Sequence, residues 1–309
     1  MQNKNAVTLP AYLALVAGIF LIGTSAILVK FANLPGIVSG FYRLGIASAA
    51  LLPVWVFQNR GVKLPVWHNL KFILLGGALF GIDIGMWNTS ILMTTAAKAT
   101  LLSNNAPVWV GLGAAILFKE KLTNKYWAGL VLALLGMSII LGIGQLGREA
   151  VSIGDLLAFS TSFFYAGVML STQKARTRVN TLTFSALYTT TATLTLLPIA
   201  LLTGQQMSGF SHQSWGALLA LGLGPQLIGW LLINYALGHL RASHVSVSLL
   251  GQPVVTAILG VIILGEALTP NQIIGGLLAL IGIYLVNQKT TVKRKHPKFK
   301  RVASPLRID

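Results

Sequence analysis

The chain contains long stretches without a single charged residue, and these restrict its fold more than any other feature. The first runs from Ala6 to Val29 and holds no Asp, Glu, Lys or Arg. A helix needs about 20 apolar residues to cross the hydrocarbon core of a bilayer, so this stretch is long enough to span it. Only 9% of the 309 residues are charged, against about 25% in soluble domains. The sequence therefore excludes a water-soluble globule and predicts an integral membrane protein.

Further segments of similar length and composition follow, with short connections between them. None shows the strict polar and apolar alternation that is typical of barrel strands, and backbone groups in lipid must be paired within the protein. We therefore expect α-helices. The predicted fold class is an all-α integral membrane protein with ten transmembrane helices. Their expected ranges are Ala11–Val29, Pro35–Phe57, Phe72–Leu92, Ala96–Phe118, Thr123–Ile143, Ile153–Gln173, Leu182–Leu202, Trp215–Leu237, Ser243–Leu264 and Pro270–Asn287.

Lysine and arginine are distributed unevenly between the two sides of these spans. With the N-terminus inside, most of the 23 basic residues lie on that side, Lys30, Lys98 and Arg148 lie on the other, and Arg43 falls within a span. Because positively charged loops stay in the cytoplasm, we expect the plasma (inner) membrane and two cytoplasmic termini. The basic segment 289–309 could bind nucleic acid or lipid headgroups. We interpret it instead as a cytoplasmic tail that helps to fix the topology, and we expect no nucleic-acid partner.

The chain contains an internal repeat. The stretch Pro107–Gly136 aligns with Pro253–Gly282 at an offset of 146 residues. Each unit holds five spans, an odd number, so the second copy must enter the membrane from the opposite side. The sequence thus predicts two inverted five-helix repeats, residues 1–146 and 147–288, followed by the tail 289–309. The aligned pairs include Glu120 with Glu266, Thr123 with Thr269, Gly129 with Gly275, and Asn88 with Asn234.

The repeated stretches also resemble a known family. They are Asn104-Asn105-Ala106-Pro107 through Lys119-Glu120-Lys121-Leu122-Thr123, and Gln252-Pro253 through Gly265-Glu266-Ala267-Leu268-Thr269-Pro270. Together they resemble the paired signature of EamA-type transporters in the drug/metabolite transporter superfamily. The resemblance implies ten helices in two inverted repeats, a central cavity and transport of small metabolites, most often export of amino acids or related compounds. It does not fix a substrate, and we interpret Glu120 and Glu266 as helix caps rather than ligands.

Two ionisable residues, Arg43 and Asp83, fall inside the expected spans. Such groups are costly in hydrocarbon and are functional candidates by default. At 1.5 Å per residue both lie about 12 to 14 Å below the outer ends of their spans, so they have a common depth and opposite signs. We predict an ion pair between them, or a relay through Asn104 or Asn105. The pair could be a structural salt bridge or could take part in transport.

The neighbours of Asp83 predict a cavity-lining face. Gly77, Gly81 and Gly85 form a ridge of small residues that lets another helix approach, and Asp83 lies on the opposite face with Trp87. The second repeat has Gly229 in place of Asp83 and supplies uncharged groups instead. This mixture suits a small solute with an amphoteric or aromatic part, because tryptophan offers a stacking surface. The further site candidates are Asn88, Gln226, Trp230, Asn234 and Gln252.

Several functions are excluded by what the sequence lacks. It has no cysteine, its five histidines form no metal-binding pair at helical spacing, and we expect neither a metal nor a cofactor. No Gly-Lys dipeptide occurs, so there is no Walker A motif for ATP. A lone Asp83 without a nearby histidine or second carboxylate is a poor catalytic set, so an enzyme is not expected.

The function that these features favour is secondary-active transport of small metabolites by alternating access. Export of amino acids or related compounds, which the resemblance implies, is the leading interpretation, with protons as a candidate coupling ion. The alternatives are an uptake or exchange carrier for another small organic solute, and a channel-like facilitator. The expected partners are a small-molecule substrate and the lipid bilayer, and the sequence does not determine the oligomeric state.

Overall fold

The structure, a computed structural model, describes residues 4–59, 65–94, 96–142, 151–264 and 269–288. Within these ranges it contains ten helices long and apolar enough to cross a membrane, and no strand, which confirms the predicted fold class. The predicted tail 289–309 and Glu266 lie outside the described residues. The ten spans, in chain order, are Leu9–Val29, Gly36–Gln58, Trp67–Ser90, Lys98–Leu117, Asn124–Leu141, Ile153–Arg176, Thr181–Leu202, His212–Leu237, Ala242–Ile263 and Pro270–Asn287.

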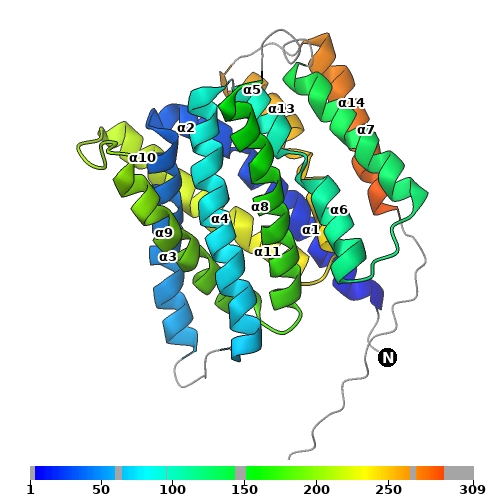
Figure 1. Cartoon of the computed structure of the whole chain (residues 1–309), viewed down its shortest axis with the longest axis horizontal. Helices are drawn as coiled ribbons and strands as arrows, with labels where there is room; N and C mark the ends of the chain where they lie inside the picture. Colours follow the sequence, from blue (N-terminus) through cyan, green and yellow to red (C-terminus); the bar gives the residue numbers. More distant parts are fainter. Residues whose placement is uncertain (1–3, 60–64, 95, 143–150, 265–268, 289–309) are drawn as a thin grey trace, which may run out of the picture.

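Several spans consist of more than one helix (Figure 1). The elements are α1 (Lys4–Gly23), α2 (Ser25–Ala32), α3 (Gly36–Gln58), α4 (Trp67–Met93), α5 (Ala96–Ser103), α6 (Ala106–Leu117), α7 (Asn124–Leu141), α8 (Ile153–Arg176), α9 (Thr181–Leu202), α10 (His212–Leu221), the π-helix η2 (Gly222–Gly229), α11 (Trp230–Leu237), α12 (Ala242–Leu249), α13 (Gln252–Leu264) and α14 (Pro270–Asn287). We name the two ends of the bundle by residues described below. The Glu120 end is where α6 meets α7, and the Asp155 end is where α8 begins.

The fourth and ninth spans are each broken in the middle, whereas the sequence predicted continuous helices. The breaks lie at Asn104-Asn105, between α5 and α6, and at Leu250-Gly251, between α12 and α13. These positions are equivalent at the repeat offset of 146. A proline follows each break, Pro107 or Pro253, and lacks the N–H that would continue the helical hydrogen bonds. The two repeats therefore carry the same interruption at the same place.

The eighth span contains the π-helix η2 between α10 and α11. A π-helix has a wider turn than an α-helix and is frequent at functional sites. Pro225 lies within it, and proline disrupts regular α-helical hydrogen bonding. The sequence analysis did not predict this element. Its counterpart in the first repeat, within α4, is α-helical.

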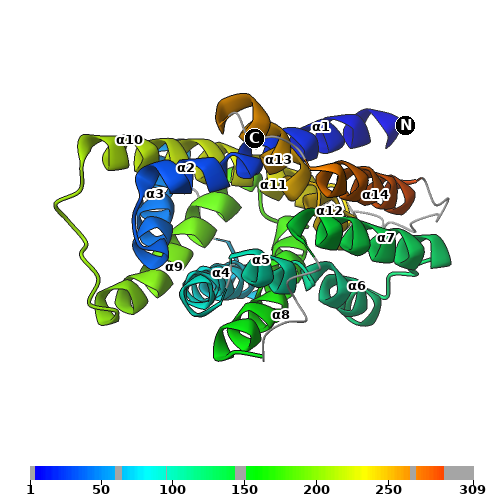
Figure 2. The same ribbon diagram turned by 90° about the horizontal axis from the view of Figure 1, so that it is seen from above.

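The repeats meet most closely where α7 crosses α14, and Figures 1 and 2 both show these helices side by side. A Cβ added at Gly129 would lie 2.7 Å from the Gly282 carbonyl oxygen, and one at Gly136 would lie 2.5 Å from the Gly275 carbonyl oxygen. Gly129 is the repeat equivalent of Gly275, and Gly136 that of Gly282. The contact is therefore reciprocal and antiparallel, as a two-fold relation between inverted repeats requires.

A second ridge of glycines holds α4 against α9. A Cβ at Gly77 would lie 2.6 Å from the Tyr188 carbonyl oxygen, and one at Gly81 would lie 2.7 Å from the Ala192 carbonyl oxygen. Side chains larger than glycine would push these helices apart. The ridge that the spacing predicts is thus confirmed, and it leaves the opposite face of α4, which carries Asp83, free to line a cavity.

Candidate functional site

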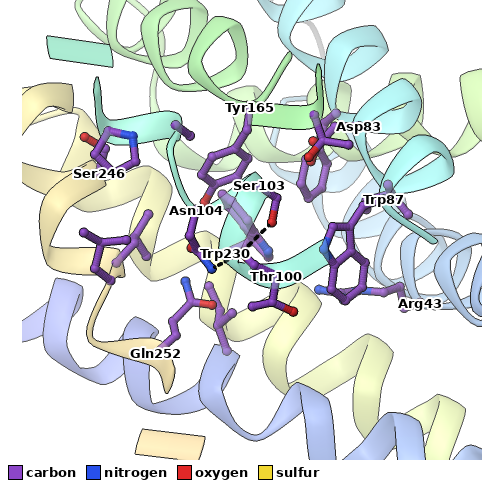
Figure 3. A pocket seen from close by; sticks show the side chains of 18 residues that line it. Arg43, Asp83, Trp87, Thr100, Ser103, Asn104, Tyr165, Trp230, Ser246 and Gln252 are labelled. Atoms are coloured by element: carbon purple, nitrogen blue, oxygen red, sulfur yellow. Dashed lines mark hydrogen bonds between the residues drawn. The ribbon is translucent and has the colours of Figure 1, made fainter. Parts of the chain in front are cut away.

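A cavity of about 210 Å³ lies between the two repeats. Its wall is built mainly from α4, α5 and α6 of the first repeat and from α8 and α12 of the second, and α11 adds Trp230. The chain breaks at Asn104 and Leu250 both border it. Figure 3 shows the side chains that line it. Six of the predicted site residues are among them: Arg43, Asp83, Trp87, Asn104, Trp230 and Gln252.

Asp83 is the acidic group of this cavity. It projects from α4 beside Phe80 and Trp87, which also line the wall. Within the described part of the chain, no hydrogen bond or ion pair reaches its carboxylate. A carboxylate in this setting lacks the compensation that buried charges normally have. Asp83 is therefore available to a ligand or a proton.

Arg43 does not form the ion pair with Asp83 that the sequence predicted. Its Nε donates a hydrogen bond to Gln226 Oε1 at 2.8 Å. This pairing arises because α3 packs along the π-helix that carries Gln226. Figure 3 shows Arg43 entering the cavity beside Trp87, while Asp83 lies on the other side of that ring in this view. The two charges thus face the same cavity without neutralising each other.

The two equivalent asparagines, Asn88 and Asn234, lie away from the cavity wall and act as braces. Asn88 Nδ2 donates to the Gly36 carbonyl oxygen at 2.7 Å, which fixes the start of α3. Asn234 Nδ2 donates to Ser185 Oγ at 3.1 Å, near the start of α9. Each asparagine therefore ties the third span of its repeat to the beginning of the second. They hold the scaffold around the site.

The asparagines at the α5–α6 break have different roles. Asn105 Nδ2 donates to the carbonyl oxygens of Leu101 and Leu102, at 3.2 and 3.0 Å, and so satisfies groups at the end of α5. Asn104 Nδ2 donates to the Thr100 carbonyl oxygen at 2.8 Å and remains on the cavity wall. No direct relay from either asparagine to Asp83 is found among the described residues.

One end of the cavity is formed by an aromatic cluster that the sequence analysis missed in part. Phe80 stacks on Tyr188 with ring centroids 5.3 Å apart, and Trp230 meets Phe80 edge-on at 4.9 Å. Tyr165 lies 6.2 Å from Trp230 and lines the cavity. No spacing rule in the sequence marks Tyr165 or Tyr188, because helices far apart along the chain bring them together.

Two hydroxyl residues of the wall, Thr100 and Ser246, were also missed, although a signal was present. They are equivalent at the offset of 146, and both line the cavity from the half-helices α5 and α12. Applying the repeat to polar residues, and not only to Pro, Glu and Gly, would have found them. Within the described residues no group of His, Cys, Asp and Glu is suited to hold a metal ion.

At the Glu120 end the repeats are joined by a polar cluster. Ser243 Oγ donates to Glu120 Oε2 at 2.7 Å, and Gln173 Nε2 donates to Glu120 Oε1 at 3.2 Å. Gln173 Oε1 in turn accepts the Ala242 N–H. Glu120 is therefore a link between repeats, and its interpretation as a helix cap is wrong. The cap of α7 is Thr123, whose hydroxyl accepts the Tyr126 N–H at 3.3 Å.

At the Asp155 end a second polar cluster fastens α5 to α8. Asp155 forms a capping box with Ser152 at the start of α8, accepts a hydrogen bond from Thr94 Oγ1 at 2.6 Å, and pairs with Lys98 Nζ at 3.4 Å. Here α5 packs on α8 and, within the part of the chain that the structure describes, has no comparable contact with α13, whereas at the Glu120 end α6 packs on α12. Figure 2 shows α13 beside α1 and away from α5. The cavity thus lies between a closed pair and a separated pair of half-helices.

Comparison with known proteins decides the family. The model of the EamA-like transporter family matches residues 9–142 and again residues 152–288. The chain belongs to the EamA-like transporter family. It is a multi-pass membrane protein and a transporter rather than an enzyme, and membership implies a small-molecule substrate and a surrounding bilayer. The two matches correspond to the two repeats.

Relatives of this transporter cover most of its length. An uncharacterized transporter of Archaeoglobus fulgidus is 28% identical over 81% of this chain and 86% of its own. A probable terminal-alkyne amino-acid exporter of Streptantibioticus cattleyicolor is 29% identical over 82% of this chain and 84% of its own. A protein of known crystal structure has the same fold, with a TM-score of 0.75 and 20% identity over 92% of this chain and 97% of the other.

Proposed function

We propose that this transporter is a secondary-active exporter of amino acids or related small metabolites in the plasma membrane, and that it works by alternating access. The observation that carries the proposal is the Asp83 carboxylate, which has no partner among the described residues and faces a cavity between inverted repeats. An ionisable group in this position marks a substrate or ion pathway. The Streptantibioticus relative, an exporter by name, supports the direction and the substrate class.

The composition of the cavity supports an amphoteric solute. Asp83 offers a negative charge and Arg43 a positive charge on one wall, and the tryptophan and tyrosine rings beside them offer apolar surface. In this mechanism Asp83 alternates between binding a proton and contacting a cationic group of the solute. Exchange of one for the other couples a gradient to transport.

Flux through proteoliposomes tests the proposal. Wild-type protein should show saturable uptake and counterflow of an amino-acid mixture, which separates a carrier from a channel. Asp83→Asn should abolish proton-driven flux, because an asparagine has no proton to release. Exchange, which need not pass through proton release, should persist if Asp83 carries only protons and should be lost if Asp83 also holds the cationic group of the solute. Arg43→Gln and the combination of Arg43→Gln with Asp83→Asn show whether Asp83 instead only holds Arg43 in place. If its role is only structural, neutralising both residues should restore flux. A stable Asp83→Asn protein with unchanged proton-driven flux would remove Asp83 from the mechanism.

The orientation is tested with single cysteines, which are unambiguous because the chain has none of its own. We propose that the loop between Lys119 and Lys125 is cytoplasmic and that the loop from Gly265 to Pro270 is external. Gly265→Cys should react with an impermeant thiol reagent added to intact cells, and Lys121→Cys should react only after the cells are opened. The reverse pattern contradicts the proposed topology.

A further inference from the structure

Two arginines lie among the membrane spans, Arg176 buried and Arg43 partly exposed. In the described part of the chain only Arg176 has an acceptor at every nitrogen of its guanidinium. Arg176 donates from Nε to the Asn234 carbonyl oxygen at 3.0 Å, from Nη1 to the Val179 carbonyl oxygen, and from Nη2 to Thr181 Oγ1 at 2.6 Å. Every nitrogen of that guanidinium has an acceptor. Three of its five N–H donors are thus paired with protein groups, and its role is structural.

Arg43 makes a single hydrogen bond, from Nε to Gln226 Oε1. In the described part of the chain nothing accepts from its Nη1 or Nη2, and the residue lines the cavity. A guanidinium has five N–H donors and no acceptor, and an unpaired charge in a low-dielectric setting is costly. Arg43 thus has unused donors and an uncompensated charge at the cavity wall.

The groups around Arg43 have spare donors too. Gln226 is 1% exposed, and because its Oε1 is taken by Arg43, its buried Nε2 is left without a partner. Trp230 is 5% exposed, lines the cavity, and its Nε1–H has no partner. Tyr188 is fully buried beneath Phe80, and its hydroxyl also lacks a partner. Buried polar groups are nearly always paired, so several orphans in one place indicate a missing ligand.

These orphans belong to one structural unit. Gln226 and Trp230 are four residues apart across the junction of η2 and α11, close to one turn of helix, so they are neighbours on the helix surface. Trp230 lines the cavity, and Gln226 is joined to the cavity wall through Arg43. Phe80 touches both Trp230 and Tyr188, which brings the tyrosine to the same cluster. The acceptor that would normally balance this set, Gln226 Oε1, is already used.

We propose that the Arg43 end of the cavity is a subsite for a small monoanionic group, held by Arg43 with Gln226 and Trp230 as neutral donors. A carboxylate or a halide fits this chemistry, because a guanidinium and neighbouring N–H donors match an anion. The anion arrives either as the carboxylate of the transported solute or as a free ion such as chloride. If the anion is the solute carboxylate, the subsite rests on the proposed transport function. If it is a free ion, the subsite does not depend on that function.

The subsite can be tested without knowing the solute. The full-length protein, purified in detergent, is melted in increasing sodium acetate or sodium chloride, with a bulky sulfonate buffer salt at matched ionic strength as reference. A ligand that binds only the folded state raises the melting temperature in a saturable way. We expect saturable stabilisation of the wild type by acetate, by chloride or by both. No saturable stabilisation by either anion overturns the proposal.

Four variants locate the effect. Arg43→Gln should abolish the stabilisation, and Trp230→Phe, which removes only the indole N–H, should weaken the apparent affinity about tenfold. Gln226→Glu keeps the arginine but gives it an internal counter-ion, so it should fold and yet no longer respond to anions. If Arg43→Gln does not fold, the Gln226→Glu variant alone tests whether the anion binds at Arg43. The matched control is Arg178→Gln, an exposed arginine outside the cavity, which should respond as the wild type does. Stabilisation that persists in Gln226→Glu overturns the proposal.

The two anion series distinguish the sources. A response to acetate alone assigns the subsite to the solute carboxylate, and a response to chloride, with or without acetate, assigns it to a free ion. Both results support the subsite. The readout does not depend on flux, so anion binding without amino-acid transport would refute the proposed function and keep the subsite. Amino-acid transport without any anion response would refute the subsite and leave the proposed function standing.

Discussion

The equivalent spans of the two repeats contact each other in several places, and two of these contacts differ in their symmetry. Where α7 crosses α14 the contact is symmetric, because the repeat operation converts the Gly129–Gly282 contact into the Gly136–Gly275 contact. Where the broken spans meet it is not. The half-helices α6 and α12 pack together at the Glu120 end, but among the described residues their counterparts α13 and α5 have no comparable contact at the Asp155 end.

In the proposed alternating-access cycle, this difference would distinguish the contacts that persist from the contacts that change. A symmetric contact is the same in both orientations of an inverted repeat, so it can persist throughout a transport cycle. An asymmetric contact has an alternative arrangement with its halves exchanged. In the proposed cycle, the other state brings α5 and α13 together and separates α6 from α12. The α7–α14 crossing would then be the fixed frame.

The largest effect is expected from locking the asymmetric contact. With Glu120→Cys and Ser243→Cys together, a short bifunctional thiol reagent should join the repeats at the Glu120 end and stop nearly all flux, because α6 and α12 can no longer separate. Flux per inserted molecule is measured before and after treatment. The single variants, and the double variant treated with a monofunctional reagent of similar size, are the controls. Full flux in a completely cross-linked sample contradicts the comparison.

The symmetric contact should instead respond in stability. In Gly275→Ala the new Cβ would lie 2.5 Å from the Gly136 carbonyl oxygen, whereas in Gly276→Ala the nearest atom is Val254 Cγ1 at 3.8 Å. We expect the first variant to lose about 1 to 3 kcal/mol of stability from forced backbone displacement, and the second to change little. Thermal unfolding in detergent compares these neighbours directly. Equal melting temperatures would show that the crossing is not tightly constrained.

A smaller effect is expected when the polar cluster at the Glu120 end is weakened but not broken. Glu120→Gln keeps an acceptor for Ser243 and loses the charge that strengthens the hydrogen bond. The loss of about 1 kcal/mol corresponds to an increase of about fivefold in the population of the state in which α6 and α12 are separated. A cysteine at Ser246, on the cavity wall, should then react several times faster with a reagent added at the Glu120 end. Glu266→Gln, the repeat counterpart, is the matched control and should not accelerate the reaction.

The smallest effect is expected outside both contacts. Deleting residues 291–309 removes the basic segment after the last span and no apolar stretch that could complete a core. Flux per inserted molecule should stay within about a factor of two, provided that the remaining charges hold the topology. Insertion is checked with the single-cysteine labels. A correctly inserted but inactive truncation contradicts this prediction.

The sequence predicted the features that depend on position along one helix. Uncharged length identified the ten spans, and the spacing of Gly77 and Gly81 identified a close helix contact, because each requires only a local rule. The partner of Arg43 could not be obtained in this way. Depth along a span follows from residue counting, but which neighbour a side chain faces depends on how helices rotate and pack. The structure gives that partner as Gln226 rather than Asp83.

The breaks in the fourth and ninth spans were only partly predictable from the sequence. Pro107 and Pro253 were visible in the sequence, and their equivalence under the repeat could have predicted the breaks at Asn104 and Leu250. Continuous helices were expected because hydropathy alone does not register a missing N–H. Glu120 was misinterpreted for another reason. A glutamate near a helix start is typical of capping, and only the fold shows that Ser243 lies within hydrogen-bonding distance of it.

The π-helix in the eighth span makes the two repeats present different side chains to the cavity between them. An extra residue in one turn rotates the side chains of the preceding part of the helix by about 100° relative to those of the following part. At the repeat offset Trp230 corresponds to Ile84, and both border the cavity, but Gln226 corresponds to Phe80 and faces Arg43 instead. Two identical halves would present a ligand with the same surface twice. The shift in helical phase adds to the sequence differences between the repeats, such as Asp83 opposite Gly229. In the proposed cycle an asymmetric solute would therefore meet chemically different groups at the two ends of the binding space.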